Sequence, residues 1–159
     1  RLPPALTVSR GNALDTSVVF DADFSALSSD QALLLEGKNL DGSFSDQFPY
    51  EVNYEFMQNG QKNYNIFCAS CHGVAGDGNG VTKPYGILAA SYHDDRLRNE
   101  PDGYIYDVIA NGKGLMYGLK DRLTNEQSWS IVLYLRALQR AQNADQSDLS
   151  LKEKSKLGL

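Results

Sequence analysis

The sequence has few of the residues that build disulfide frameworks, metal clusters or membrane spans. It contains 2 cysteines, 2 histidines and 1 tryptophan among 159 residues. The longest apolar run, residues 131–135, is far shorter than the roughly 20 residues that a helix needs to cross a bilayer. A formal net charge of −5 argues against a nucleic-acid partner and against simple adsorption on anionic lipid. The composition therefore predicts an ordinary globular chain.

Both cysteines belong to one short motif, Cys68-Ala69-Ser70-Cys71-His72. A disulfide between them would close a very short loop and add little stability. A thioredoxin-like redox site needs a βαβ pattern, which the sequence lacks, and a zinc site needs more ligands than His93 can supply. The remaining interpretation is covalent attachment of one haem c, with both thiols bonded to the porphyrin and His72 as an iron ligand.

The second axial ligand is predicted to be Met116. It follows the glycine-rich stretch 112–114, where the backbone can bend toward the iron. Met57 lies upstream on the helix that leads into the motif and should not reach the opposite haem face. His93 lies in a polar stretch that is more typical of a surface or propionate-side residue, and a methionine that only fills the core remains the alternative for Met116. Iron with two protein ligands has no open position for a substrate, so the pattern predicts electron transfer without a small-molecule substrate.

Four further residues are predicted to lie at the haem. Tyr64, Phe67 and Trp129 are aromatic residues of apolar helix faces, which would pack in the core and, where that core is a porphyrin, touch the ring. Pro84 lies in the loop after the motif, where its carbonyl is predicted to accept the Nδ1 proton of His72 and so fix the imidazole.

The rest of the chain is predicted to be helical or loop-like, without strands or internal repeats. Residues 1–52 form an extended N-terminal segment that packs on the core, residues 53–144 the haem domain, and residues 145–159 a polar tail, either a short helix or disordered. The glycine-rich stretch 73–80 is a loop. Apolar periodicity and capping signals predict helices over about 29–35, 53–67, 101–110 and 124–141.

These features resemble the class I cytochrome c fold over about residues 53–140. The matching pieces are Gly60-x3-Tyr64-x3-Cys68-x-x-Cys71-His72-Gly73, then Gly-x-Gly-x-Met116, then Val132-Leu133-Tyr134-Leu135-Arg136-x-Leu138. The resemblance implies an all-α domain around one covalently bound haem c, with its first and last helices crossing beside the haem. The long N-terminal segment is an extension to that fold.

The chain is also similar to the mono-haem cytochrome c subunit of bacterial alternative complex III, a quinol:electron-acceptor oxidoreductase. The matching pieces include Arg1-x-Pro3-Pro4-x2-Thr7-Val8-x-Arg10-Gly11, Ser91-Tyr92-His93-Asp94-Asp95-Arg96-Leu97-Arg98 and Arg136-Ala137-Leu138-Gln139-Arg140-x-Gln142-Asn143-Ala144. The resemblance implies a periplasmic, membrane-associated subunit of a respiratory chain. It would take electrons from partner subunits and pass them to a terminal oxidase or a small carrier.

Two other functions are alternatives to a subunit of a membrane complex. The first is a free periplasmic electron shuttle; because the sequence opens at Arg1, a lipid anchor upstream of it would not be seen. The second is a catalytic haem protein with an exchangeable sixth ligand, which the Met116 prediction disfavours.

Overall fold

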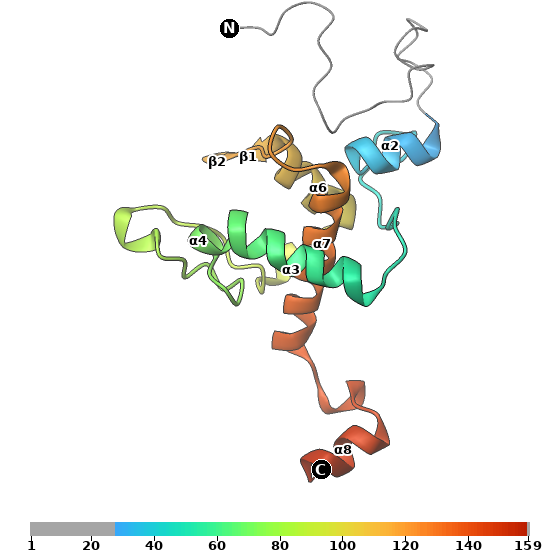
Figure 1. Ribbon diagram of the computed structural model, residues 1–159, viewed down its shortest axis with the longest axis vertical. Helices are drawn as coiled ribbons and strands as arrows, with labels where there is room; N and C mark the ends of the chain where they lie inside the picture. Colours follow the sequence, from blue (N-terminus) through green and yellow to red (C-terminus); the bar gives the residue numbers. More distant parts are fainter. Residues whose placement is uncertain (1–27, 159) are drawn as a thin grey trace, which may run out of the picture.

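The computed structural model describes residues 28–158, and this part of the chain is mostly helical, as predicted. The longer helices are α2 (Ser29–Glu36), α3 (Tyr54–Phe67), α6 (Asp102–Asn111) and α7 (Asn125–Asn143). The shorter ones are α4 (Ala69–His72), α5 (Asp95–Arg98) and α8 (Leu151–Leu157), with 3-10 turns η1 (Lys83–Tyr85) and η2 (Gln146–Asp148). Figure 1 shows α3 lying across α7, with α6 beside the upper half of α7.

The crossing of α3 over α7 is the centre of the fold. Gly60 allows it, because a β-carbon on Gly60 would lie 1.9 Å from the carbonyl oxygen of Ser130 on α7. The side chains on both sides of the crossing are buried, among them Tyr64 on α3 and Val132 and Leu135 on α7. Two helices can approach this closely only where a side chain is missing, and the buried apolar area then stabilises the contact.

The helix ends follow the capping signals in the sequence. Thr124 caps α7: its hydroxyl accepts a hydrogen bond from the Gln127 backbone at 3.1 Å, and the Gln127 side chain accepts one from the Thr124 backbone at 2.9 Å. Ser28 forms the same reciprocal pair with Gln31 at the start of α2. Each reciprocal pair satisfies two backbone groups that the first turn of a helix leaves without partners. The four predicted helices are confirmed, with ends that differ by one or two residues.

Residues 28–52 pack against α6 and α7. The indole nitrogen of Trp129 donates to the Leu34 carbonyl at 3.1 Å, and the Tyr106 hydroxyl donates to the Leu35 carbonyl at 3.3 Å. The Phe48 ring meets Trp129 edge-on at 5.4 Å. These partly buried hydrogen bonds anchor a segment that has few apolar residues of its own. Residues 1–27, the first half of the predicted N-terminal segment, lie outside the described residues.

The prediction that no strand would be found is wrong at one place. β1 (Gly112–Lys113) and β2 (Met116–Tyr117) form a two-residue antiparallel hairpin directly after α6, in which Lys113 pairs with Met116. The turn is tight because Gly114 adopts φ +61, which other residues rarely adopt. Strands this short leave no alternating pattern in the sequence. In the tail, the structure has the short helix α8, which Figure 1 places beyond the end of α7.

Candidate functional site

Cys68 joins two helices, since it ends α3 and begins the single turn of α4. Its carbonyl accepts hydrogen bonds from the backbone of Cys71 at 3.1 Å and of His72 at 2.9 Å. Both thiols are free, so neither is engaged in a disulfide. Burial raises the pKa of the Cys68 thiol to about 12, which keeps it protonated, whereas the Cys71 side chain is only half-buried.

Tyr64 fixes the place where the chain leaves the motif. Its side chain is fully buried, and its hydroxyl donates to the carbonyl of Gly73 at 2.6 Å. Its ring packs against Tyr134 of α7 at 5.3 Å and meets Tyr92 edge-on at 6.3 Å. The residue therefore connects the helix crossing to the segment that surrounds His72, and burial raises its pKa well above the usual value.

The loop that follows the motif folds back over it. The backbone of Gly78 donates to the carbonyl of His72 at 2.8 Å, and that of Thr82 donates to the carbonyl of Ser70 at 3.2 Å. Gly80 passes close to the backbone of the motif, because a β-carbon on it would lie 2.2 Å from the carbonyl oxygen of Ser70. The predicted glycine-rich loop is thus confirmed, and it satisfies the carbonyls that a single helical turn leaves open.

The imidazole of His72 is held on two sides. Its Nδ1 lies 3.0 Å from the carbonyl oxygen of Ala90, and its ring stacks on Tyr92 with centroids 4.5 Å apart. Because a carbonyl can only accept, Nδ1 carries the proton and the lone pair lies on Nε2. Burial lowers the pKa of His72, while the bond to Ala90 acts in the opposite direction. A neutral imidazole with its lone pair on Nε2 is the form that binds iron.

The prediction that Pro84 accepts this proton is wrong. Pro84 is exposed and lies in the turn η1, which directly follows the hydrogen bond from Thr82 to Ser70. The chain then returns past His72 only at residues 90–92, where the Tyr92 backbone donates to the Gly76 carbonyl at 2.8 Å. Ala90 and Tyr92 are the residues that sequence reasoning missed, because neither an alanine carbonyl nor a stacked tyrosine has a sequence signature.

Met116 lies on β2 and is half-buried. Figure 1 shows the hairpin and α4 extending to the same side of α6 and α7. The neighbours of Met116 in the chain are almost fully exposed, Leu115 at 99 % and Tyr117 at 90 %. The role of Met116 as an iron ligand stays a prediction.

The remaining predicted site residues fall into two groups. Phe67 is partly buried and packs on the core one residue before the motif, and its contact with the haem stays a prediction. Trp129 is fully buried: it stacks on Tyr106 at 4.6 Å, and its nitrogen bonds to Leu34, so that its place at the haem stays a prediction. These contacts account for its burial as part of the core. His93, the other ligand considered, lies 2.8 Å through Nε2 from the carbonyl oxygen of Ala75.

The residues around the motif fit a haem. Two free thiols lie on one helical turn, and the Nε2 of His72 carries a lone pair. Several large apolar side chains of the following loop and of the hairpin are half exposed or more, namely Val81, Tyr85, Ile87, Leu88, Leu115 and Tyr117. These exposed apolar side chains are available to cover an apolar group such as a porphyrin. Within residues 28–158, no cluster of three or more acidic, cysteine or histidine residues offers an alternative metal site.

A helical domain that carries C-x-x-C-H at the end of its first core helix defines a c-type cytochrome. Residues 55–135 match the family model described as "Cytochrome C oxidase, cbb3-type, subunit III", and the chain belongs to this cytochrome c family. The family implies electron transfer, a covalently bound haem c and redox proteins as partners. No curated protein matches the sequence.

Solved structures support the same fold. Cytochrome cL from Hyphomicrobium denitrificans is 19% identical, with a TM-score of 0.50, over 92% of this chain and 80% of its own. Cytochrome cL from Methylophaga aminisulfidivorans is also 19% identical, with a TM-score of 0.50, over 82% of this chain and 81% of its own. The c-type cytochrome KustC0563 is 28% identical over 50% of this chain and 95% of its own, with a TM-score of 0.44. The two cytochromes cL share the cytochrome c fold with this chain. Among residues 28–158, no helix is long and apolar enough to cross a membrane.

Proposed function

We propose that this protein carries one haem c, bound through Cys68 and Cys71 with His72 and Met116 as axial ligands, and that it transfers single electrons. The observation that carries the proposal is the 3.0 Å distance from His72 Nδ1 to the Ala90 carbonyl oxygen, which assigns the proton to Nδ1 and leaves the Nε2 lone pair for iron. The sequence contains one C-x-x-C-H motif, which supports a single haem. When bound, the haem supplies the redox couple.

The chain's own residues would keep this centre rigid between redox states. Cys68 caps the single turn of α4 and Cys71 lies within it, and the Tyr64 hydroxyl holds the chain at Gly73. The Ala90 carbonyl holds the Nδ1 proton of His72 and thereby raises the basicity of the imidazole. A ligand that does not reorient during transfer lowers the reorganisation that each electron requires. A thioether from Met116 would favour the ferrous state relative to a second imidazole.

We further propose that the electrons come from partner subunits of a quinol-oxidising membrane complex and pass to a terminal oxidase or a small carrier. The support is the similarity of residues 1–11, 91–98 and 136–144 to the corresponding subunit of alternative complex III. In that setting the protein is periplasmic and membrane-associated through the complex or an upstream lipid anchor. The net charge of −5 suits a partner with a basic docking face.

The ligand assignment is tested by replacing Met116 with alanine in the haem-loaded protein. The weak far-red methionine–iron charge-transfer band of the ferric protein should disappear, and the reduction potential should fall because a thioether no longer stabilises the ferrous state. Met57→Ala is the matched control, because Met57 is the only other methionine and lies on α3. A band that survives Met116→Ala contradicts the assignment, and its loss in Met57→Ala would identify Met57 as the ligand instead.

The proposed complex is tested by mild detergent extraction of membranes from the native source. Co-purification of this cytochrome with quinol-oxidising activity supports the membrane complex. A cytochrome that is recovered alone, without a lipid modification, supports a free shuttle instead. A ferric spectrum that changes on addition of cyanide or peroxide would identify an exchangeable ligand and so a catalytic haem protein.

A further inference from the structure

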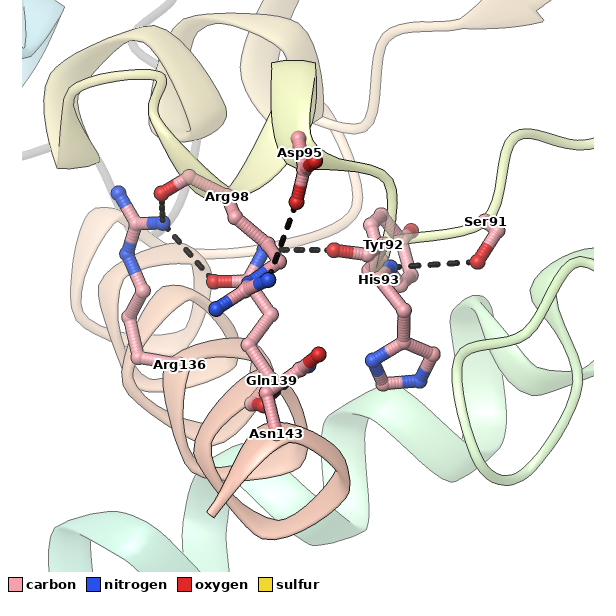
Figure 2. Close-up of polar contacts among 8 residues, drawn as sticks. All are labelled: Ser91, Tyr92, His93, Asp95, Arg98, Arg136, Gln139 and Asn143. Atoms are coloured by element: carbon pink, nitrogen blue, oxygen red, sulfur yellow. Dashed lines mark hydrogen bonds and ion pairs between the residues drawn. The ribbon is translucent and has the colours of Figure 1, made fainter. Parts of the chain in front are cut away.

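Two side chains of α7 hold the segment that passes His72. The Nε2 of Gln139 donates to the backbone carbonyl of Tyr92 at 2.9 Å, and Gln139 is buried. The Oε1 of Gln139 accepts in turn from the guanidinium of Arg136 at 2.9 Å. Figure 2 shows both side chains reaching from α7 to the Tyr92 and Arg98 backbone. The amide of Gln139 therefore uses its donor and its acceptor to join this segment to α7.

Arg136 is itself fixed at several points, so it is a rigid support for Gln139. Its Nε pairs with the Asp102 carboxylate at 2.6 Å, at the first residue of α6. Its terminal nitrogens donate to the backbone carbonyls of Arg98, at 3.2 Å, and of Glu100. A guanidinium that is held by a carboxylate and two carbonyls has little freedom to move.

The segment held in this way makes both contacts to the His72 ring. Ala90 accepts the Nδ1 proton, and Tyr92 stacks on the ring face, with the two planes at 21°. The carbonyl that Gln139 binds belongs to Tyr92 itself. Displacement of this segment would therefore have two effects at once. It would lengthen the hydrogen bond from Nδ1 to Ala90, and it would let the imidazole ring rotate.

We propose that Gln139, supported by Arg136, is a positioning residue that sets the orientation and basicity of the His72 imidazole through Tyr92 and Ala90, and so tunes the reduction potential of the iron. This inference rests on the proposed function, in that it takes His72 as the iron ligand. A stronger bond from Nδ1–H to a carbonyl makes the imidazole a better donor and favours ferric iron. Loss of the Gln139 contact should then weaken that bond and raise the potential.

The test replaces Gln139 by methionine in the haem-loaded protein. Methionine has a similar length and no charge, but it neither donates to Tyr92 nor accepts from Arg136. At a fixed solution potential, we expect the ratio of ferrous to ferric protein to rise about threefold or more. This change corresponds to a rise of about 28 mV in the reduction potential of a one-electron couple. The Nδ1 proton of His72 should exchange faster in the ferrous protein. The hyperfine-shifted haem methyl resonances of the ferric protein should change their spread, because they report the plane of the imidazole.

The control is Tyr106→Phe, which removes hydrogen bonds to Leu35 and Asn125 and leaves the bond from Gln139 to Tyr92 in place. It should lower stability without moving the potential or the methyl resonances. A Gln139→Met protein that loses stability and keeps the potential, exchange rate and methyl resonances of the wild type overturns the proposal.

A second variant keeps the proposal testable where Gln139→Met does not fold. Tyr92→Leu removes the stacked ring and leaves the backbone carbonyl for Gln139. It should change the methyl resonances, because the stacked ring no longer fixes the plane of the imidazole, and unchanged resonances would overturn the proposal. Failure of His72 as a ligand is distinguished from these outcomes because it would show in the wild type, whose spectra would then lack a haem-bound His72 imidazole.

Discussion

Gly60→Ala tests whether the approach of α3 to α7 depends on a missing side chain. The added β-carbon would lie 1.9 Å from the Ser130 oxygen, 2.7 Å from its carbonyl carbon and 3.1 Å from the β-carbon of Tyr134. The first two atoms belong to the backbone of α7, which cannot rotate away as a side chain would. The two helices must therefore separate.

The size of the effect follows from that separation. An ordinary contact distance of 3.4 Å in place of 1.9 Å requires the helices to move apart by about 1.5 Å. A gap of roughly 1 Å already removes up to about half of the dispersion energy between facing atoms. The facing side chains, such as Tyr64, Val132 and Leu135, are each worth about 1.5–3 kcal/mol when buried. We expect a packing loss of about 3–4 kcal/mol, offset by about 1 kcal/mol from the better helix propensity of alanine.

The net prediction is a loss of about 2–3 kcal/mol in the free energy of unfolding. The assay is urea unfolding of the ferric, haem-loaded protein followed by far-UV circular dichroism. Lys62→Ala is the matched control, because Lys62 is exposed on the same helix and its replacement should change stability by less than about 0.5 kcal/mol. An unchanged or increased stability of Gly60→Ala would refute the reasoning, since that is the behaviour of a glycine on a free helix surface.

Two further substitutions test the aromatic residues. Tyr64→Phe removes the hydroxyl that bonds to Gly73 and should cost about 1–2 kcal/mol in urea unfolding. Burial raises the pKa of Tyr64 above its usual 10.0, so the hydroxyl keeps its proton to a higher pH in the folded state than in the unfolded chain. The free energy of unfolding should therefore fall as the pH rises above 10. This decrease should be less steep in Tyr64→Phe. Trp129→Phe loses the bond to Leu34 and leaves a cavity, which should lower stability by about 2–3 kcal/mol. The reduction potential of Trp129→Phe should equal that of the wild type, because the contacts of Trp129 are to core residues. A changed potential would show that Trp129 contacts the haem.

Local signals in the sequence predicted most of the helices and the attachment motif. A capping pair such as Thr124 and Gln127 is complete within four residues, so the start of α7 follows from the sequence alone. The spacing of Cys68, Cys71 and His72 likewise needs only one helical turn. The tight hairpin after α6 could not be predicted, because its strands of two residues are too short to show a period.

The sequence by itself determined that this chain is helical and has the motif that binds a haem, because both depend on residues that are neighbours along the chain. Only the tertiary structure decided what surrounds His72. The carbonyl of Ala90 rather than that of Pro84 accepts its proton, since the loop turns at η1 and returns past the imidazole only at residues 90–92. Gln139 reaches that segment from a helix 47 residues further along, and no pattern in the sequence specifies so distant a contact.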